Sequence, residues 1–241
     1  MIFSMCEYKM KGKIYLIPSE MGEQSAERLF PAYNVQIVQN IAFFVVENAR
    51  TARRFVKKIC PEKNIEESCF FEINKYDPAD KVAEMIKPVL EGENLGIISE
   101  AGMPCIADPG NLVVAEAHKH NIKVQPLVGP NSIIMALISS GFNGQNFAFH
   151  GYVPLKDEKR RTIQQWESIA LKSGQTQIFM ETPYRNMQLF QDLLTILKPS
   201  TKLCIATDIT LETEEIVTKS VQDWKKATPN LNKRPSIFLI M

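Results

Sequence analysis

The sequence predicts an α/β protein made of two lobes. Apolar, strand-like runs alternate with helix-like stretches along most of the 241 residues. The connections between them are short, which is typical of mostly parallel sheets covered by helices on both faces. Because a single sheet holding every predicted strand would be unusually wide, we expect lobes at 11–128 and 129–241, after a tail at 1–10. A cleft between two such lobes is the default place for a ligand.

In the first lobe, strands are expected where short apolar runs stop at polar residues or glycine, at 13–17, 35–38, 42–46, 70–73, 95–98 and 123–128. Asn48 can cap a helix over 51–59, since its side chain can accept from free backbone N–H groups. Asp77 and Pro78 can begin a second helix, and Pro88 should kink it or end it early before Gly92. A third helix is expected at 112–119.

The second lobe repeats this alternation. After Gly129 and Pro130, a helix is expected at 132–139, with Gly141 just beyond its end. Further strands are expected at 147–153, 177–180, 203–206, 215–219 and 236–241, with helices at 162–171, at 186–197 and near Trp224.

Composition narrows the function classes. The chain is 45% hydrophobic and 23% charged, which argues against disorder. Its net charge of +1 means that any nucleic-acid surface must be a local patch. The five cysteines are scattered without a C-x-x-C pair, so we expect neither a disulfide framework nor a metal site, and a reducing cytoplasm fits best. The apolar runs are too short to span a bilayer, and the amino terminus lacks the shape of a signal peptide, so we expect no membrane partner.

The stretch from Gly96 to Gly110, GIISEAGMPCIADPG, is the most informative segment. An apolar run stops at Ser99, and glycine and proline then crowd the next residues, which marks a tight loop at the end of a strand. In open α/β sheets, ligands bind outside this end of the strands. An ordinary connection between strand and helix is an equally good interpretation of the spacing alone.

Several signatures are absent from the chain. It contains no G-x-x-x-x-G-K-[ST] phosphate loop, no G-x-G-x-x-G and no G-x-S-x-G elbow. His118 and His120 stand two residues apart on a predicted helix and make a poor metal pair. His150 follows the pattern of a strand, and a structural role is favoured over a site role for it.

Four segments at predicted strand ends carry a family resemblance. They read VENAR at 46–50, SEAGMPCIADPG at 99–110, PLVGPNS at 126–132 and ETPYR at 181–185. In this order they resemble AEDTR, SDAGTPxISDPG, PLPGPSA and ESPHR of the S-adenosylmethionine-dependent methyltransferases of the tetrapyrrole methylase superfamily. The most similar branch is that of the ribosomal RNA small-subunit cytidine 2′-O-methyltransferases. The resemblance extends from Gly12 to Met241.

The chain also departs from this pattern. The family's opening strand is followed by TPIGN, whereas here Pro18, Ser19, Glu20, Met21 and Gly22 follow, so the glycine is displaced and a carboxylate is introduced. The acidic residue and threonine of EDTR are replaced by asparagine and alanine. A branch with a shifted substrate, or a module that binds without turnover, is therefore an alternative.

The resemblance implies a two-lobed, class III methyltransferase fold, with each lobe a mixed sheet flanked by helices. It implies S-adenosylmethionine as cofactor, ribosomal RNA or the small ribosomal subunit as partner, and a homodimer. Carried over by motif, the residues expected to contact the cofactor are Pro18, Gly102, Met103, Pro104, Ile106, Ala107, Asn131, Ser132, Met180, Asp208 and Ile209.

Three carboxylates at predicted strand ends are candidates for a catalytic base or a substrate-orienting group: Glu47, Glu100 and Glu181. A ribose hydroxyl is a poor nucleophile and benefits from such a group. Each of them could instead cap a helix or pair with Arg50 or Arg185, and that alternative remains open.

One feature favours RNA independently of the family. Arg50, Arg53, Arg54, Lys57 and Lys58 recur at helical spacing, so they form a basic stripe on one helix. Phosphates would be attracted to this stripe, with strong salt dependence, although a solvated helix face is the simpler interpretation of charge alone. The ETPYR motif adds Arg185 to the substrate candidates, and a second basic cluster lies at Lys156, Lys159, Arg160 and Arg161.

Taken together, these features predict a methyltransferase that uses S-adenosylmethionine and modifies a ribose hydroxyl of ribosomal RNA. The alternatives are a methyltransferase of the same fold acting on a small, tetrapyrrole-like molecule and a non-catalytic module that binds cofactor or RNA.

Overall fold

The computed structural model describes residues 10–23, 28–154 and 157–241. The chain divides into two compact units, Met1–Pro130 and Asn131–Met241, which are taken here one at a time. Apart from Met10, the predicted tail at 1–10 lies outside the described residues, and so does Lys156 of the second basic cluster.

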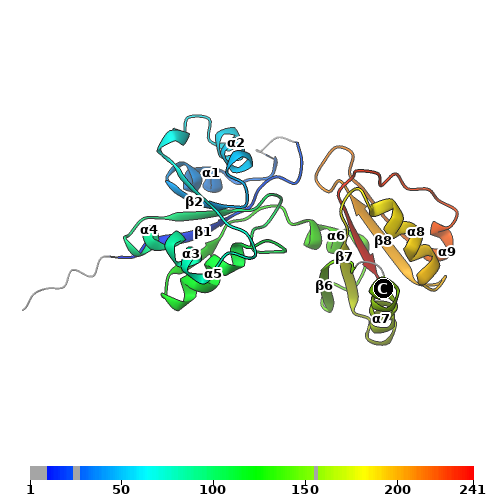
Figure 1. Cartoon of the computed structure of the whole chain (residues 1–241). Helices are drawn as coiled ribbons and strands as arrows, with labels where there is room; N and C mark the ends of the chain where they lie inside the picture. Colours follow the sequence, from blue (N-terminus) through cyan, green and yellow to red (C-terminus); the bar gives the residue numbers. More distant parts are fainter. Residues whose placement is uncertain (1–9, 24–27, 155–156) are drawn as a thin grey trace, which may run out of the picture. The chain divides into compact units, whose positions relative to one another are not determined.

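The first unit is built on a parallel sheet (Figure 1). Its strands stand in the order β3-β2-β4-β1-β5, and every described pairing between them is parallel. This sheet is therefore more uniform than the mixed sheet that the family resemblance implies. Its members are β1 (Lys13–Ile17), β2 (Phe43–Val46), β3 (Cys69–Glu72), β4 (Leu95–Ile98) and β5 (Lys123–Pro126).

Helices cover both faces of this sheet (Figure 1). Two of them pack in one apolar core, which includes Val38 and Val56, and the helices on the other face pack in a second core, which includes Val82 and Val113. Burial on both faces is the reason that strands such as β4 are apolar at every position. The helices are α1 (Ala32–Gln39) and α2 (Ala49–Ile59) on one face, α3 (Ala79–Met85), α4 (Lys87–Leu90) and α5 (Gly110–Lys119) on the other, and a short 3₁₀ turn at Ile65–Glu67.

Two expectations for this unit are wrong in detail. The predicted strand at 35–38 lies within α1, because helical spacing buries Asn34 and Val38 on one face and lets the Asn34 amide donate to the Val128 carbonyl at 2.7 Å. Pro78, not Asp77, stands at the N-cap of α3. The expected effect of Pro88 is confirmed, since α3 ends at Met85 and α4 begins at Lys87.

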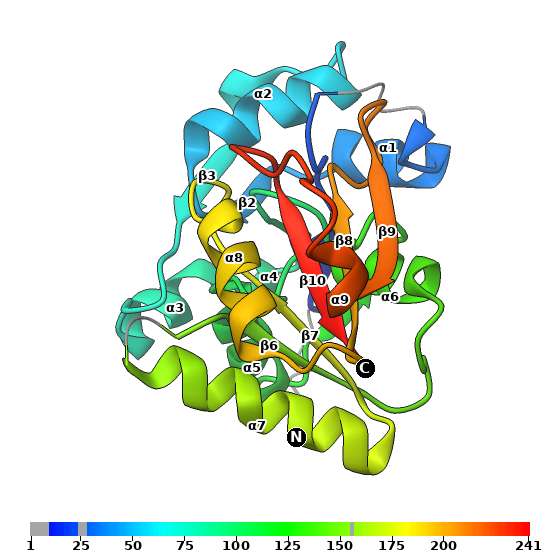
Figure 2. The same ribbon diagram turned by 90° about the vertical axis from the view of Figure 1, so that its right-hand side faces the viewer.

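The second unit is built on a mixed sheet with the strand order β6-β7-β10-β8-β9 (Figure 2). Only β6 and β7 pair in parallel, and the other described pairings are antiparallel. Its elements are α6 (Ser132–Ser140), β6 (Phe147–Tyr152), α7 (Asp157–Ser173), β7 (Thr176–Met180), α8 (Asn186–Ile196), β8 (Lys202–Thr207), β9 (Glu215–Ser220), α9 (Val221–Trp224) and β10 (Ser236–Ile240).

Aromatic rings form the centre of the second core. The Trp166 ring stacks on Phe179 with centroids 5.1 Å apart, and Phe179 stacks on Phe238 at 6.1 Å. His150 stacks on the other side of Trp166 at 4.3 Å and shares a 2.8 Å hydrogen bond with the Gln177 side-chain oxygen. The histidine therefore has the structural role that the sequence favours.

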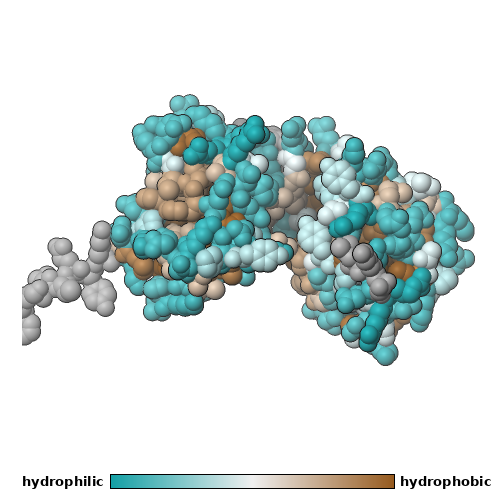
Figure 3. All heavy atoms as spheres, viewed as in Figure 1, coloured by the Kyte–Doolittle hydropathy of each residue, from teal (hydrophilic) through white to brown (hydrophobic). Residues whose placement is uncertain are grey.

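The outer faces of the two units differ from these cores. Figure 3 shows mostly hydrophilic side chains on the visible surface of each unit, interrupted by separate apolar areas. Within the described residues, no helix is long and apolar enough to cross a membrane.

Candidate functional site

Polar residues gather at the carboxyl edge of the first sheet. Because its strands are parallel, the residues that follow β1, β2 and β4 all emerge at this edge. Ser19 follows β1, Glu47 follows β2, and Ser99 and Glu100 follow β4. The two serines are buried, whereas the two glutamates are exposed.

The carbonyl oxygen of Gly102 joins two of the loops at this edge. It accepts from the Ser19 backbone N–H at 2.9 Å and from the Ser99 hydroxyl at 2.6 Å. Gly102 adopts a φ of 72°, a conformation that glycine reaches without steric strain. The loops after β1 and β4 are therefore fixed to each other at a residue predicted to contact the cofactor.

Asp108 holds the rest of the loop in shape. Both of its carboxylate oxygens accept from the Cys105 N–H at 2.9 Å, and one of them also accepts from the Gly110 N–H at 2.8 Å. Between these contacts, Cys105 and Ala107 have φ values of 68° and 60°, which are unfavourable for residues with a Cβ. Burial raises the pKa of Asp108, while its two backbone partners oppose that shift.

The predicted cofactor residues in the loop that Asp108 holds differ in their exposure. Pro104 is buried, Met103 is half-buried, and Ile106 and Ala107 are exposed, with Ile106 at 42%. An apolar side chain and a small one are thus presented on a rigid loop. This is the form of surface that suits an uncharged, flat ligand group.

Pro18 has a packing role at the same edge. It is buried, and its ring lies where a Cβ on Gly129 would stand, at 2.1 Å from the Pro18 Cγ. Only glycine at 129 allows this approach. The structure thus brings Pro18 against the Pro126–Ser132 motif, which lies more than a hundred residues further along the chain.

Glu47 and Glu100 form a group of carboxylates with Asp108. The pKa of Glu47 is raised, first by partial burial and then by the negative charges of Asp108 and Glu100. Glu100 accepts a 2.6 Å hydrogen bond from the Thr51 hydroxyl on α2. Sequence reasoning missed Thr51, because its partner lies 49 residues away and nothing in the local pattern marks it.

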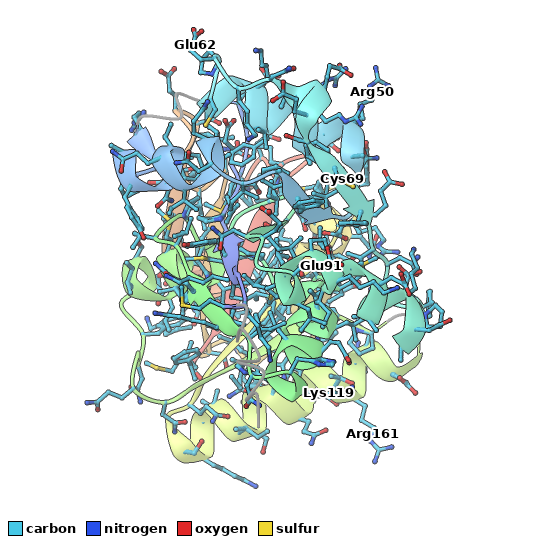
Figure 4. All side chains as sticks on the ribbon, turned by 90° about the vertical axis from the view of Figure 1, so that its left-hand side faces the viewer. Arg50, Glu62, Cys69, Glu91, Lys119 and Arg161 are labelled. Carbon is cyan, nitrogen blue, oxygen red and sulfur yellow. The ribbon has the colours of Figure 1, made fainter. Side chains whose placement is uncertain are left out.

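The predicted basic stripe begins beside this group. Asn48 caps α2 by accepting from the backbone N–H groups of Arg50 and Thr51, which confirms the predicted cap. Arg50 and Arg54 are exposed, and Figure 4 shows Arg50 projecting outward at the start of the helix. Arg53 lies over the Phe70 ring, 5.3 Å from its centroid.

Lys57 belongs to the basic stripe but uses its ammonium group for backbone contacts. Its ammonium group donates to the carbonyl oxygens of Pro61 and Lys63, so it satisfies backbone groups just beyond the end of α2. Lys58 forms a 2.7 Å ion pair with Glu20 in the loop after β1. The structure therefore leaves the amino-terminal half of α2 as the better surface for an anion.

The first unit also contains a pocket of about 380 Å³ between this edge and α2. Among the residues singled out from the sequence as catalytic or RNA-binding candidates, Arg54, Lys58 and Glu100 line it. Among the described residues, its lining is formed by Ser19, Glu20, Gly22, Glu23, Thr51, Ala52, Arg54, Phe55, Lys58, Ile98, Ser99 and Glu100. Four of them lie outside the segments that the sequence marks, so sequence reasoning could not select them: Glu23, Thr51, Ala52 and Phe55.

The remaining site candidates belong to the second unit. Glu181 is buried, and its Oε1 accepts from the Arg185 guanidinium and from the Thr182 N–H, both at 2.7 Å. The open alternative, in which Glu181 pairs with Arg185, is therefore what the structure contains. Met180 precedes this pair at the end of β7 and is half-buried.

Two other candidates of this unit also have local partners. Asn131 caps α6 by accepting from the Ile133 and Ile134 N–H groups at 3.0 and 3.1 Å, and Ser132 follows it half-buried. Asp208, with a φ of 50°, accepts from Arg234 Nε at 2.7 Å and from the Thr213 hydroxyl at 2.8 Å. Ile209 beside it is buried.

No cluster of three or more metal-ligating side chains exists within the described parts of the chain. Around the pocket and the Asp108 loop, the first unit offers carboxylates, hydroxyls, exposed apolar groups and nearby guanidinium groups.

Known proteins resemble this chain along most of its length. The small-subunit ribosomal RNA methyltransferase I of Haemophilus influenzae is 29% identical over 175 residues, which cover 71% of this chain and 60% of that protein. Its counterpart from Vibrio cholerae is 26% identical over 230 residues, which cover 94% of this chain and 76% of the relative.

Solved structures share the fold. The methyltransferase CobJ matches with a TM-score of 0.62 at 14% identity, over 95% of this chain and 93% of that one. The uroporphyrin-III C-methyltransferase of Thermus thermophilus, in complex with S-adenosyl homocysteine, matches with a TM-score of 0.56 at 13% identity, over 95% and 97%. The predicted two-lobed α/β fold is thereby confirmed.

The family model of the tetrapyrrole (corrin/porphyrin) methylases matches residues 29–224, which is well over half of the chain. This match includes the Asp108 loop, the Gly129 motif and the Glu181 motif, and it confirms the predicted methyltransferase class. The chain belongs to the tetrapyrrole methylase family.

Proposed function

We propose that this protein transfers a methyl group from S-adenosylmethionine to a ribose 2′-hydroxyl of small-subunit ribosomal RNA. The observation that carries the proposal is the carboxyl edge of the first sheet, where Glu47 stands directly before α2, a helix with exposed arginines, and Glu100 accepts from Thr51 of that helix. A carboxylate can accept the proton of a hydroxyl, and guanidinium groups attract the phosphates on either side of a ribose.

The relatives give this proposal its substrate. Both proteins described above are named as methyltransferases of small-subunit ribosomal RNA, and the Vibrio cholerae relative aligns with nearly the whole of this chain. The corrin and porphyrin methylases share the fold at much lower identity, so they support the architecture without deciding the acceptor.

The residues of the Asp108 loop fit the proposed methyl donor. Exposed Ile106 and Ala107 offer apolar surface for an adenosyl group, and the buried Gly102 would fix the loop that carries them through the hydrogen bonds to its carbonyl oxygen. Pro18, Met103 and Pro104 would support this surface from below. From the second unit, we assign Asn131, Ser132, Met180, Asp208 and Ile209 to the same donor. Bound S-adenosylmethionine would supply the electrophilic methyl group.

Of the three carboxylates, Glu47 is best suited to act as the base. Glu181 is neutralised by Arg185, and Glu100 is engaged by the Thr51 hydroxyl. Glu47 lies at the surface and forms no ion pair within the described residues. Its pKa is raised by partial burial and by the charges of Asp108 and Glu100, against the opposing effect of a hydrogen bond from the Glu100 backbone N–H. In the reaction, the ribose O–CH₃ bond forms as the S–CH₃ bond breaks, and Glu47 takes the hydroxyl proton.

Arg50, Arg53 and Arg54 would position the RNA. They lie within two turns of α2, and Asn48 fixes the start of this helix next to Glu47. Their contribution should depend on salt, because each phosphate that they contact releases a counterion. Arg185 is assigned a smaller role, since Glu181 holds its guanidinium.

Mass spectrometry of small-subunit RNA tests this function in cells. RNA from cells that lack the protein should lose one ribose methylation, and wild-type protein supplied in trans should restore it. The Glu47→Gln variant should not restore it, although it binds the donor normally. An unchanged modification map in the deletion strain would exclude the ribosomal RNA assignment.

We include a homodimer and a cytoplasmic location in this proposal. Ile134 and Ile138 on α6 are exposed, with Ile138 at 74%, and provide an apolar surface that a second copy could cover. Light scattering after size-exclusion chromatography measures the oligomeric state. A monomer at all concentrations would remove the dimer from the proposal.

A further inference from the structure

The pocket between α2 and the carboxyl edge has a carboxylate in its wall. Glu20 lies in its wall, with a side chain that is only 15% exposed. Its Oε2 forms the 2.7 Å ion pair with Lys58, whereas its Oε1 is buried and has no hydrogen-bond partner among the described residues. A buried acceptor without a partner is costly, so an N–H or O–H donor that reaches the Glu20 carboxylate would stabilise it.

The rest of the pocket wall narrows the chemistry of this donor. Phe55 and Ile98 give it apolar surface, and the buried residues Ser19 and Ser99 add hydroxyl groups to its lining. The volume of about 380 Å³ falls within the range of roughly 300–1,000 Å³ that is common for small-molecule sites. A flat ring with one polar edge matches this combination better than a charged or a purely apolar group.

Cations border the pocket on the side of α2. Arg54 lines the pocket and is exposed. Lys58 also lines it and forms an ion pair with Glu20. A nucleobase in the pocket would therefore have Glu20 as its partner, and the phosphates of its backbone would have cations on the adjacent part of the same surface. This arrangement is typical of the recognition of unstacked bases in single-stranded RNA.

We propose that Glu20 determines base specificity by accepting a hydrogen bond from the exocyclic amino group of a nucleobase held in this pocket. The inference rests on the proposed function and deepens it. Carboxylates are suited to this task because they accept from the amino group of cytosine or adenine. The carbonyl oxygen of uracil at the same place would face the carboxylate and be repelled.

The proposal concerns a feature of this chain rather than of its family. Glu20 stands in the Pro18–Gly22 segment, where the sequence departs from TPIGN and introduces a carboxylate. The backbone of this segment is fixed, because the Ser19 N–H donates to the Gly102 carbonyl. The departure therefore adds a hydrogen-bond acceptor to the wall of the pocket.

Binding of two short RNAs tests the assignment. Octacytidylate and octauridylate have the same backbone and differ on the edge of each base, where cytosine carries an amino group and uracil a carbonyl. Affinities are measured at one salt concentration with protein saturated with S-adenosylhomocysteine. The wild-type protein should bind octacytidylate about tenfold more tightly, which corresponds to about 1.4 kcal/mol.

Three variants connect this preference to the pocket. Glu20→Met, which keeps the length and removes the acceptor, should bring the two affinities within twofold of each other. Glu20→Gln, which keeps a neutral acceptor, should retain part of the preference. Glu62→Met changes an exposed glutamate of the same unit that is not among the lining residues of the pocket, and should behave like the wild type. Loss of the Lys58 partner affects both RNAs equally, so it cancels in the ratio.

The outcomes separate this proposal from the proposed function. If wild-type protein methylates small-subunit RNA but binds the two octamers equally, the role of Glu20 is refuted and the function stands. If neither octamer binds, or if Glu20→Met keeps the full preference, the proposal is also refuted. If the preference follows Glu20 but no RNA is methylated, the base pocket stands and the proposed function fails.

Discussion

Removal of the Asp108 carboxylate should loosen the loop that we assign to the methyl donor. In the Asp108→Ala variant, the N–H groups of Cys105 and Gly110 lose their acceptors at 2.9 and 2.8 Å. A hydrogen bond to a charged group contributes about 1.5–3 kcal/mol. Because burial raises the pKa of Asp108, the carboxylate itself has a cost in the folded state. We therefore expect a net loss of about 2 kcal/mol in the free energy of unfolding.

The same change should weaken donor binding beyond its effect on stability. Cys105 and Ala107 have positive φ values, which cost about 1–2 kcal/mol for each such residue, and the Asp108 carboxylate accepts from the backbone N–H groups of Cys105 and Gly110 on either side. Without the clamp, the loop can relax and Ile106 would leave its position. Affinity for S-adenosylhomocysteine, measured by calorimetry on the folded variant, should fall by about tenfold or more.

Asp77→Ala is the matched control for this prediction. Asp77 accepts from the Asn74 backbone N–H at 3.0 Å and from its side-chain amide at 2.6 Å, so the variant also loses local acceptors. It should lower the free energy of unfolding and leave the donor affinity unchanged. If both variants bind S-adenosylhomocysteine like the wild type, the assignment of the Asp108 loop to the donor is wrong.

Three other predictions follow from the same structure. Gly129→Ala places a Cβ 2.1 Å from Pro18 Cγ and should lower the free energy of unfolding by about 1–3 kcal/mol in a urea titration. Because the pKa of Glu47 is raised above its ordinary 4.5, methyl transfer should increase as the pH rises through that pKa, and Glu47→Gln should lose this increase together with most of the rate. Arg234→Met leaves Asp208 as an unpaired buried carboxylate and should cost about 3–5 kcal/mol by the same titration.

Each of these predictions has a result that would count against it. Gly144→Ala meets nothing within 4 Å and should change stability by less than about 0.5 kcal/mol; an equal effect of Gly129→Ala would show that Pro18 does not pack as described. A flat pH profile in the wild type would remove Glu47 as the base. A change below about 1 kcal/mol in Arg234→Met would mean that solvent reaches Asp208.

The raised pKa of Glu47 also fixes the sign of its effect on stability. The folded state holds this proton more tightly than the unfolded state, so stability falls as the pH rises from 4.5 through the raised value. In Glu47→Gln this fall should be absent. Thermal unfolding across this pH window, compared with the wild type, measures the difference.

Local patterns predicted the sheet of the first unit well. β1 and β4 begin and end where the sequence places them, because continuous apolar runs between polar residues identify strands buried on both faces. The cap at Asn48 was equally predictable from chemistry alone. The run at 35–38 was misread as a strand because four residues cannot distinguish a short strand from one turn of a buried helix.

The partners of the site residues could not be predicted in the same way. Glu20 and Lys58 are 38 residues apart, Thr51 and Glu100 are 49 apart, and only the strand order brings each pair together. Local sequence therefore indicates which loops lie at the ligand edge. It does not show which side chains remain free to act there.

Motifs that point to a site also contain residues whose role is to hold the local structure. Asn131 was assigned to the donor from its motif, and its side chain caps α6. Glu181 was a catalytic candidate, and its carboxylate holds Arg185 and the start of the turn before α8. A sequence motif therefore contains both ligand contacts and residues that shape the loop, and the sequence alone does not distinguish between them.

The most direct test of the account is methyl transfer by the purified protein. Small ribosomal subunits that lack the modification are incubated with S-adenosylmethionine carrying a deuterated methyl group, and the RNA is digested and analysed by mass spectrometry. The account predicts one labelled nucleoside, with the label on the ribose oxygen, and a strong loss of label with Glu47→Gln. Label on a base, or no label in RNA at any protein concentration, would contradict it.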